Sequence, residues 1–354
     1  NSTKIITREP NGGFNGIRHN ISYFDDDTHI PFQRHRRLRL RKRHSPAGSV
    51  ADIQDDRRIR ETMRTGLVDI DGHHFPNLAL MKLSAWHKSQ GDSVEFANPM
   101  FGCYDRVYMS KVFTFTPDCS DIYHCEVIRG GTGFRDYTTT LPEEVEHICP
   151  DYSLYGVDEA YGFLTRGCPN RCPWCIVPHK EGSIRPASPI REFIGNKRRA
   201  VLLDNNVLAS DFGLEQIEEI VRMGIAVDFN QGLDARKACN DAYVLDLLAR
   251  VKWISQIRFA CDRMSQLESV VKCVEELGHR GVKPYKIFVY CLIQDVGDAL
   301  ERIDALRKLG VIPFAQPYRD FDNNIEPTKE QKRLARWCNH KAIFKSVEFK
   351  NYKG

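Results

Sequence analysis

Three cysteines that lie close together in the sequence are the residues best suited to chemistry. Cys168, Cys172 and Cys175 have the spacing Cys-x3-Cys-x2-Cys, and no fourth cysteine lies near them. Cysteine thiolates hold iron–sulfur clusters, and a four-iron cluster normally takes one thiolate per iron. Three thiols therefore leave one iron open to a ligand that is not protein. Pro169 and Pro173 lie between the cysteines and stiffen this loop, because proline fixes φ.

A zinc site is the alternative for the same cysteines. Structural zinc takes four nitrogen or sulfur ligands, commonly as pairs of Cys or of Cys and His. His179, four residues after Cys175, is a candidate fourth ligand. The other nine cysteines have no framework spacing, so we expect them to be reduced and mostly buried.

Alternating strands and helices must position the cysteine loop. Apolar runs predict strands at 162–164, 201–203, 226–229, 256–260, 286–292 and 311–315. Apolar residues that recur every three or four positions predict helices around 214–221, 267–277 and 300–309. Six strand–helix units predict an α/β fold with a partial TIM-like (β/α)6 barrel, in which the cysteines follow the first strand. Active sites in such folds gather at the C-terminal ends of the strands.

Polar side chains follow several of these strands directly and are expected to face the barrel mouth. Carboxylates and amides can accept hydrogen bonds from an ammonium, and arginine can grip a carboxylate with two parallel bonds. The candidates for contacts to ribose, carboxylate or substrate are Asp204, Asn205, Asn206, Asn230, Gln231, Asp234, Arg236, Arg258 and Asp262. Taken singly, each is equally typical of a turn or an ion pair.

The cysteine motif, with Trp174 just before its last cysteine, resembles that of the radical S-adenosylmethionine superfamily. The resemblance covers about residues 155–320, within a core domain expected at 151–327. It implies that Cys168, Cys172 and Cys175 hold a [4Fe-4S] cluster and that S-adenosylmethionine chelates the fourth iron. One electron then cleaves the sulfonium to give methionine and a 5′-deoxyadenosyl radical, which abstracts hydrogen from a substrate. A flavodoxin-type or ferredoxin-type protein is the implied one-electron donor.

The same resemblance assigns roles to Trp174 and to the polar residues after the second strand. The aromatic residue of the family motif lines the adenine pocket, which implies this position for Trp174. The family often has Gly-Gly-Glu after the second strand, where it binds the amino group of the methionine moiety. This chain has Asp204, Asn205 and Asn206 there, so the placement is implied but the individual contact differs.

Residues 63–150 are expected to form a small doubly wound, Rossmann-like domain. Strands are predicted at 66–70, 94–97, 106–109 and 126–128, and an amphipathic helix runs from Leu78 towards Gly91. This segment resembles the cobalamin-binding-like domain found ahead of some radical S-adenosylmethionine enzymes. The cobalamin signature Asp-x-His-x-x-Gly is matched by Asp71 and His73, but Pro76 replaces the glycine. Two readings follow: a bound cobalamin, or a domain without cofactor that binds substrate or partner.

The two ends of the chain are basic. Residues 1–62 hold 13 Lys and Arg against 8 Asp and Glu and are expected to be a disordered leader, with Met63 as a candidate natural start. Residues 328–354 mix lysine and arginine with Trp337, Phe344 and Phe349. That mixture suits nucleic-acid binding, and it also suits a helix packed on the barrel with a solvated basic face.

The composition, 42% hydrophobic and 28% charged, is that of an ordinary globular protein, and no apolar run predicts a membrane span. We therefore expect a cytoplasmic radical enzyme without a membrane partner, whose substrate and net reaction the sequence leaves open. The alternatives are a cobalamin-dependent radical methyltransferase and a non-enzymatic, zinc-stabilised nucleic-acid-binding protein.

Overall fold

The structure is a computed structural model that describes residues 62–72, 75–320, 323 and 325–354. The chain is a mixed α/β protein whose sheets are mostly parallel. The expected leader, apart from its last residue, and both His73 and His74 lie outside the described residues.

The front part of the chain contains one parallel sheet of four strands in the order β2-β1-β3-β4. All four expected strands are confirmed, as β1 (Arg64–Asp69), β2 (Ser93–Phe96), β3 (Arg106–Ser110) and β4 (Glu126–Gly130). The expected helix is also confirmed, as α1 (Leu78–Ser89), with a second helix, α2 (Glu143–Glu146). Helix α1 begins at Asn77, whose side chain accepts a hydrogen bond from the amide of Leu80.

The connections on the second face of this sheet differ from a doubly wound pattern. The described segments 97–105 and 111–125 contain no helix. Instead, the ring of Tyr104 packs so closely on Gly66 that a Cβ there would lie 3.1 Å from it. Irregular chain, held by such side-chain contacts, thus takes the place of crossover helices.

The second part of the chain contains two further parallel sheets. One has the order β10-β9-β8-β5 and the other the order β11-β12-β13, and a parallel bridge between Leu233 and Phe259 joins their neighbouring edges. The strands are β5 (Ala160–Gly162), β8 (Arg199–Leu202), β9 (Ala226–Phe229), β10 (Lys252–Trp253), β11 (Ile257–Ala260), β12 (Ile287–Ile293) and β13 (Ile312–Pro317). Five of the six expected strands are confirmed, whereas the first, expected at 162–164, lies two residues earlier as β5. Strand β10, only two residues long, was not expected.

A short antiparallel hairpin brackets the cysteine loop. It pairs β6 (Thr165–Arg166) with β7 (Arg185–Pro186), and α3 (Val177–Lys180) lies between them. The sequence did not predict this hairpin, because two-residue strands carry no periodicity.

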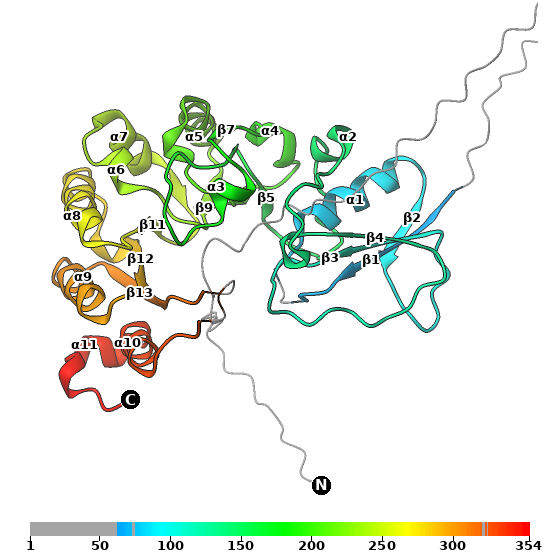
Figure 1. The fold of residues 1–354 in the computed structure, drawn as a ribbon. Helices are drawn as coiled ribbons and strands as arrows, with labels where there is room; N and C mark the ends of the chain where they lie inside the picture. Colours follow the sequence, from blue (N-terminus) through cyan, green and yellow to red (C-terminus); the bar gives the residue numbers. More distant parts are fainter. Residues whose placement is uncertain (1–61, 73–74, 321–322, 324) are drawn as a thin grey trace, which may run out of the picture.

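Helices form an arc around the outside of the strands of the second part (Figure 1). They are α4 (Ile190–Phe193), α5 (Asp211–Met223), α6 (Ala235–Ala238), α7 (Ala242–Arg250), α8 (Met264–His279) and α9 (Val296–Lys308). Helices α5, α8 and α9 confirm the three helical patterns expected from the sequence.

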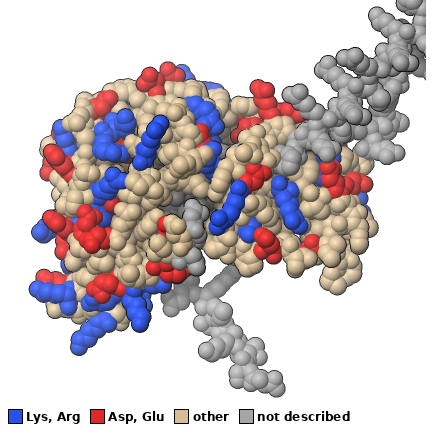
Figure 2. All heavy atoms as spheres, in the orientation of Figure 1, with Lys and Arg blue, Asp and Glu red and all other residues tan. Residues whose placement is uncertain are grey.

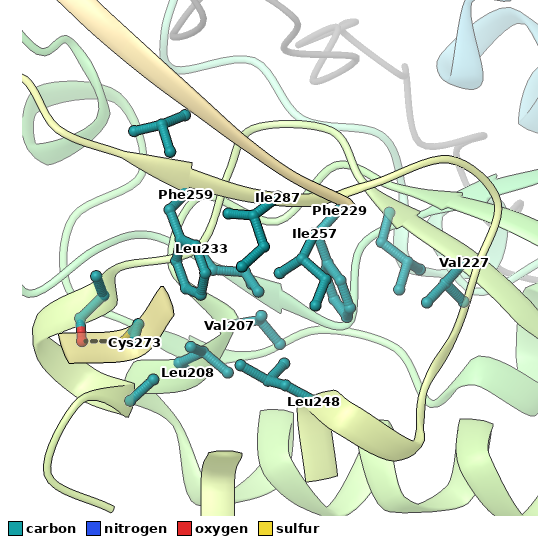
Figure 3. Close-up of a cluster of buried hydrophobic side chains, with 14 of the residues drawn as sticks. Val207, Leu208, Val227, Phe229, Leu233, Leu248, Ile257, Phe259, Cys273 and Ile287 are labelled. Atoms are coloured by element: carbon teal, nitrogen blue, oxygen red, sulfur yellow. Dashed lines mark hydrogen bonds between the residues drawn. The ribbon is translucent and has the colours of Figure 1, made fainter. Parts of the chain in front are cut away.

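The main core lies between these helices and the strands. Alternate residues of β12, namely Ile287, Val289 and Cys291, belong to one buried apolar cluster, to which α8 and α9 also contribute. Figure 3 shows part of this cluster, with Phe229, Phe259 and neighbouring side chains pointing towards one another. Because successive side chains of a strand point to opposite faces, Tyr290 and Leu292 face the interior of the strand series.

Apolar and polar contacts tie the front part to the second part. Leu78 and Met81 of α1 belong to the main buried cluster rather than to the smaller cluster of the front sheet. The hydroxyl of Tyr155 donates to Oδ2 of Asp69, at the end of β1, at 2.7 Å.

The C-terminal segment packs on the last strand. Helix α10 (Lys329–Asn339) and α11 (Lys341–Ser346) bury Trp337 and Phe344, while Lys332 and Arg336 are exposed. The amide of Asn339 bonds both the N–H and the C=O of Ala315, at 2.8 and 2.9 Å. The reading of these residues as a packed helix with a solvated basic face is therefore confirmed. On the visible face of the molecule, basic and acidic side chains are interspersed (Figure 2).

Candidate functional site

One cavity brings the three cysteines together with the polar ends of several strands. It encloses about 150 Å³ and lies at the C-terminal ends of the parallel strands of the second part. Its polar and sulfur-bearing lining residues include Cys168, Asn170, Cys172, Trp174, Cys175, Asn205, Asn206, Gln231, Asp234, Arg236, Asp262, Gln266, Tyr290 and Gln316.

The cysteine loop has a tightly constrained start. Gly167 has φ of 78°, and a Cβ on it would lie 2.3 Å from the carbonyl oxygen of Ser183. Only glycine fits this position, because other residues rarely adopt such a φ and the space is filled. The amide of Cys168 then donates to the carbonyl of Gly182 at 3.2 Å, and that of Cys175 to the carbonyl of Cys172 at 3.0 Å.

Glu181 fastens the base of this loop from within. Its Oε2 accepts hydrogen bonds from the amide of Gly167 at 2.7 Å and from the side chain of Asn205 at 3.0 Å. Burial alone would raise the pKa of Glu181, but the guanidinium of Arg166, 3.5 Å away, and these hydrogen bonds lower it. The carboxylate is therefore ionised and connects the loop to the end of β8. Nothing in the sequence distinguished Glu181 from an ordinary loop residue.

Asp234 links the loop to the end of β9. Asn170, which lies between the first two cysteines, donates to Oδ2 of Asp234 at 2.9 Å. Arg236 grips the same carboxylate with two bonds of 2.8 and 2.7 Å, and these contacts lower the pKa of Asp234 against the effect of burial. Asp234 and Arg236 were expected at the mouth and line the cavity; Asn170 was not expected.

Asn206 lies beside the first cysteine. Its Nδ2 is 3.5 Å from Sγ of Cys168 and 3.4 Å from Oδ2 of Asp234. Its Oδ1 is buried and has no hydrogen-bond partner among the described residues. Buried polar atoms are normally paired, so this oxygen is a candidate acceptor for a ligand that carries a donor.

Trp174 lines the cavity, and the guanidinium of Arg263 lies 4.2 Å from the centre of its ring. A cation at this distance is attracted to the aromatic face. The ring is thereby held at the wall of the cavity next to Cys175.

Three of the expected contacts to ribose, carboxylate or substrate do not line the cavity: Asp204, Asn230 and Arg258. Both oxygens of Asp204 are used within the protein, since they accept from the amides of Leu164 and Thr165 at 3.2 and 2.6 Å. Burial raises the pKa of Asp204 to about 6. Arg258 is not a lining residue either, because it makes two bonds of 2.5 Å to Asp228. The side chains of Asp204 and Arg258 serve to join neighbouring strands.

Within the described residues, no three His, Cys, Asp or Glu side chains converge on one point as ligands of a single metal ion. A four-iron cluster places a different demand on the loop, since each thiolate binds a different iron. His179, the candidate fourth zinc ligand, is exposed on α3 and does not line the cavity.

The front part has its own polar cluster at the ends of β1 and β3. The carboxylate of Asp71 accepts hydrogen bonds from the amides of Val112 and Phe113 and from the hydroxyl of Thr116, at 2.5, 3.2 and 2.6 Å. Asp71 thus joins the chain that follows β1 to the loop after β3. The candidate ligand His73 lies outside the described residues.

No protein-family model matches the chain, and no curated protein matches it either. Within the part of the chain that the structure describes, no helix has the length and apolar character needed to cross a membrane.

Proposed function

We propose that this protein is a radical S-adenosylmethionine enzyme. The observation that carries the proposal is the cavity in which Cys168, Cys172 and Cys175 meet strand-end polar groups, with the unpaired Oδ1 of Asn206 beside the first cysteine. Three thiols supply one ligand fewer than a four-iron cluster normally takes. The cavity wall offers hydrogen-bond acceptors for whatever fills the fourth position.

The fold is consistent with this class. The order β5-β8-β9, the bridge to β11 and the order β11-β12-β13 correspond to a six-unit partial TIM-like barrel with an additional short strand, β10. The front sheet has the order β2-β1-β3-β4, as in flavodoxin-like members of the Rossmann group. We propose these two architectures for residues 151–327 and 63–150, followed by an extension at 328–354.

The residues present fit the cluster and its cofactor. Thiolates are the ligands that iron–sulfur clusters require, and these three occupy one short, stiffened loop. When bound, the cluster and S-adenosylmethionine would supply a 5′-deoxyadenosyl radical that abstracts hydrogen from the substrate. The twelve cysteines are all free, which suits a reducing compartment such as the cytoplasm and an electron donor of the flavodoxin or ferredoxin type.

The protein groups would orient the cofactor. Oδ1 of Asn206 would accept from the ammonium of the methionine moiety, and Asn205, held by Glu181, borders the same wall. Trp174 would cover the adenine. Because Arg236 already neutralises Asp234, this pair would contribute hydrogen bonds rather than a net charge.

We do not extend the proposal to cobalamin. Asp71, the first residue of the matching signature, holds the loop after β3 with both of its carboxylate oxygens, which is a structural role. These contacts favour a front domain that supports the core domain and binds no cobalamin.

Metal analysis tests the proposal against the zinc alternative. Protein purified without oxygen should contain about four irons and four acid-labile sulfides per chain, in keeping with [4Fe-4S] clusters. The matched variants are Cys168→Ala, Cys172→Ala and Cys175→Ala, with Cys103→Ala, an exposed cysteine of the front part, as the control. Zinc without iron in the native protein, or iron retained in all three loop variants, would overturn it.

A further inference from the structure

Two glutamines of the cavity wall have buried amide atoms without a partner. Oε1 of Gln231 and Nε2 of Gln316 make no hydrogen bond within the part of the chain that the structure describes. The two residues are only 8% and 4% exposed, and both line the cavity. Leaving a buried amide unpaired costs free energy, so two such groups in one cavity indicate that a bound group supplies their partners.

Gln316 lies far along the strand series from the cysteine loop. It is on β13, paired with Leu292 of β12, whereas the cysteines follow β5 at the other end of the series. Gln316 lies two residues after Phe314 on the same strand, so the two side chains point to the same face. The ring of Phe314 packs on Tyr290, so this face is the interior of the strand series rather than the side covered by helices. A group bound by Gln316 therefore lies towards the end of the cavity away from β5.

Tyr290 connects the surroundings of the two glutamines. Its hydroxyl donates to the carbonyl of Asn230 at 3.0 Å, directly before Gln231. A Cβ on Gly232, directly after Gln231, would lie 3.2 Å from its ring. Gln231 is thus held near the hydroxyl end of Tyr290. Gln316 is on β13, the strand that pairs with the strand of Tyr290.

Two carboxylates near this wall are paired with arginines, whereas Asp262, which lines the cavity, has no ion-pair partner within the described residues. Asp228 and Arg258 pair below Tyr290, and Arg236 pairs with Asp234. Oδ1 of Asp262 accepts from the amide of Leu292 at 3.0 Å, and the carbonyl of the same residue accepts from the buried guanidinium of Arg302 at 2.9 Å. An anionic ligand group would find no unpaired cation among the lining residues, and burial raises the pKa of Asp262, which disfavours a carboxylate counter-charge for a cationic one.

We propose that Gln231 and Gln316 form a recognition site for an uncharged, carboxamide-like group of the substrate. A carboxamide offers a C=O and an N–H side by side, which matches one unpaired donor and one unpaired acceptor on the wall. An amide side chain can also turn to present either end. The proposal rests on the proposed function only in assigning the bound group to the substrate.

Three probes of the same shape but different charge test the site: benzamide, benzoate and benzamidinium. Ligand-observed NMR titrations would use cluster-loaded protein with saturating S-adenosylmethionine. We expect benzamide to bind at least ~10-fold more tightly than either ion. Equal binding of the three probes, or preference for an ion, would overturn the proposal.

Two variants of Gln316 make the test specific. Gln316→Leu should weaken benzamide binding about 10-fold, the loss expected for an unpaired amide, whereas Gln90→Leu, at an exposed position outside the cavity, should not. Gln316→Glu should make benzamidinium the preferred probe, and a misfolded variant cannot produce such a reversal. An unchanged order of the probes in Gln316→Glu contradicts the proposal.

The result separates this site from the cofactor. If S-adenosylmethionine displaces benzamide competitively, the two glutamines bind the cofactor and the proposal is wrong. If the native protein takes up no iron–sulfur cluster but still shows the probe preference, the glutamine site stands and the proposed function fails. If the protein cleaves S-adenosylmethionine but shows no preference among the probes, the proposed function stands and the glutamine site fails.

Discussion

Lys180 donates a hydrogen bond from Nζ to Oγ1 of Thr132 at 2.7 Å, and both residues are buried. Lys180 ends α3, five residues after Cys175, whereas Thr132 begins the short turn that follows β4 of the front sheet. The neighbouring Glu181 binds Gly167, directly before Cys168. Two consecutive residues thus fasten the cysteine loop to the front part on one side and to the end of β8 on the other.

Removal of the Thr132 hydroxyl should loosen the loop. Thr132→Val keeps the shape of the side chain but leaves the buried ammonium with one acceptor fewer, which should lower the free energy of unfolding by about 1.5–3 kcal/mol. Thr132→Ser keeps the hydroxyl and is the matched control. Urea unfolding and the iron content per chain are the measurements. Equal stability and equal iron content in the two variants would show that the contact does not hold the loop.

The stability of the protein should fall as the pH rises through the titration of Asp204. Burial raises the pKa of this carboxyl from 3.8 to about 6 in the folded state, so between these values the folded protein binds the extra proton. The contribution of Asp204 to the free energy of unfolding is fully present below about pH 4 and is lost above about pH 6. The loss is about 3 kcal/mol, at about 1.4 kcal/mol for each pKa unit.

Asp204→Asn provides the comparison, since an amide does not titrate. The difference in unfolding free energy between native protein and variant should change by about 3 kcal/mol from pH 4 to pH 7, with the native protein losing stability. Urea titrations of metal-free protein at several pH values measure it. A constant difference, or one that changes in the other direction, contradicts the burial argument.

Trp337 should be essential to the packing of the C-terminal segment. It is fully buried, donates from Nε1 to the carbonyl of Val347 at 2.9 Å and packs edge-on against Phe344. Trp337→Ala should lower the free energy of unfolding by about 3–5 kcal/mol. Lys332→Ala, on the exposed face of the same helix, should change it by less than about 0.5 kcal/mol. Similar effects of the two changes would mean that the segment does not pack as described.

The long elements of this fold were predictable because apolar residues recur at regular intervals. Strands β9 and β12 and helices α5, α8 and α9 all carry such a pattern over at least four residues. The two-residue strands β6, β7 and β10 carry none. The helix-free connections of the front sheet were missed for a related reason: single contacts such as Tyr104 on Gly66 hold them.

The site was predictable only in part. The three cysteines, Trp174 and Asn206 line one cavity because they directly follow strands or lie in the loop that does. Asp204 and Arg258 also stand at strand ends, yet they bond neighbouring strands, and the sequence does not show which way a polar side chain turns. Glu181 and Asn170 were missed because their partners, Asn205 and Asp234, are distant in the sequence.

The formation of 5′-deoxyadenosine tests the central claim most directly. Protein shown to contain a full cluster would be reduced with dithionite in the presence of S-adenosylmethionine, and the products would be measured by mass spectrometry. The proposed function predicts 5′-deoxyadenosine and methionine in equal amounts from the native protein, and neither from Cys172→Ala. Fully loaded, reduced native protein that forms no 5′-deoxyadenosine would contradict it.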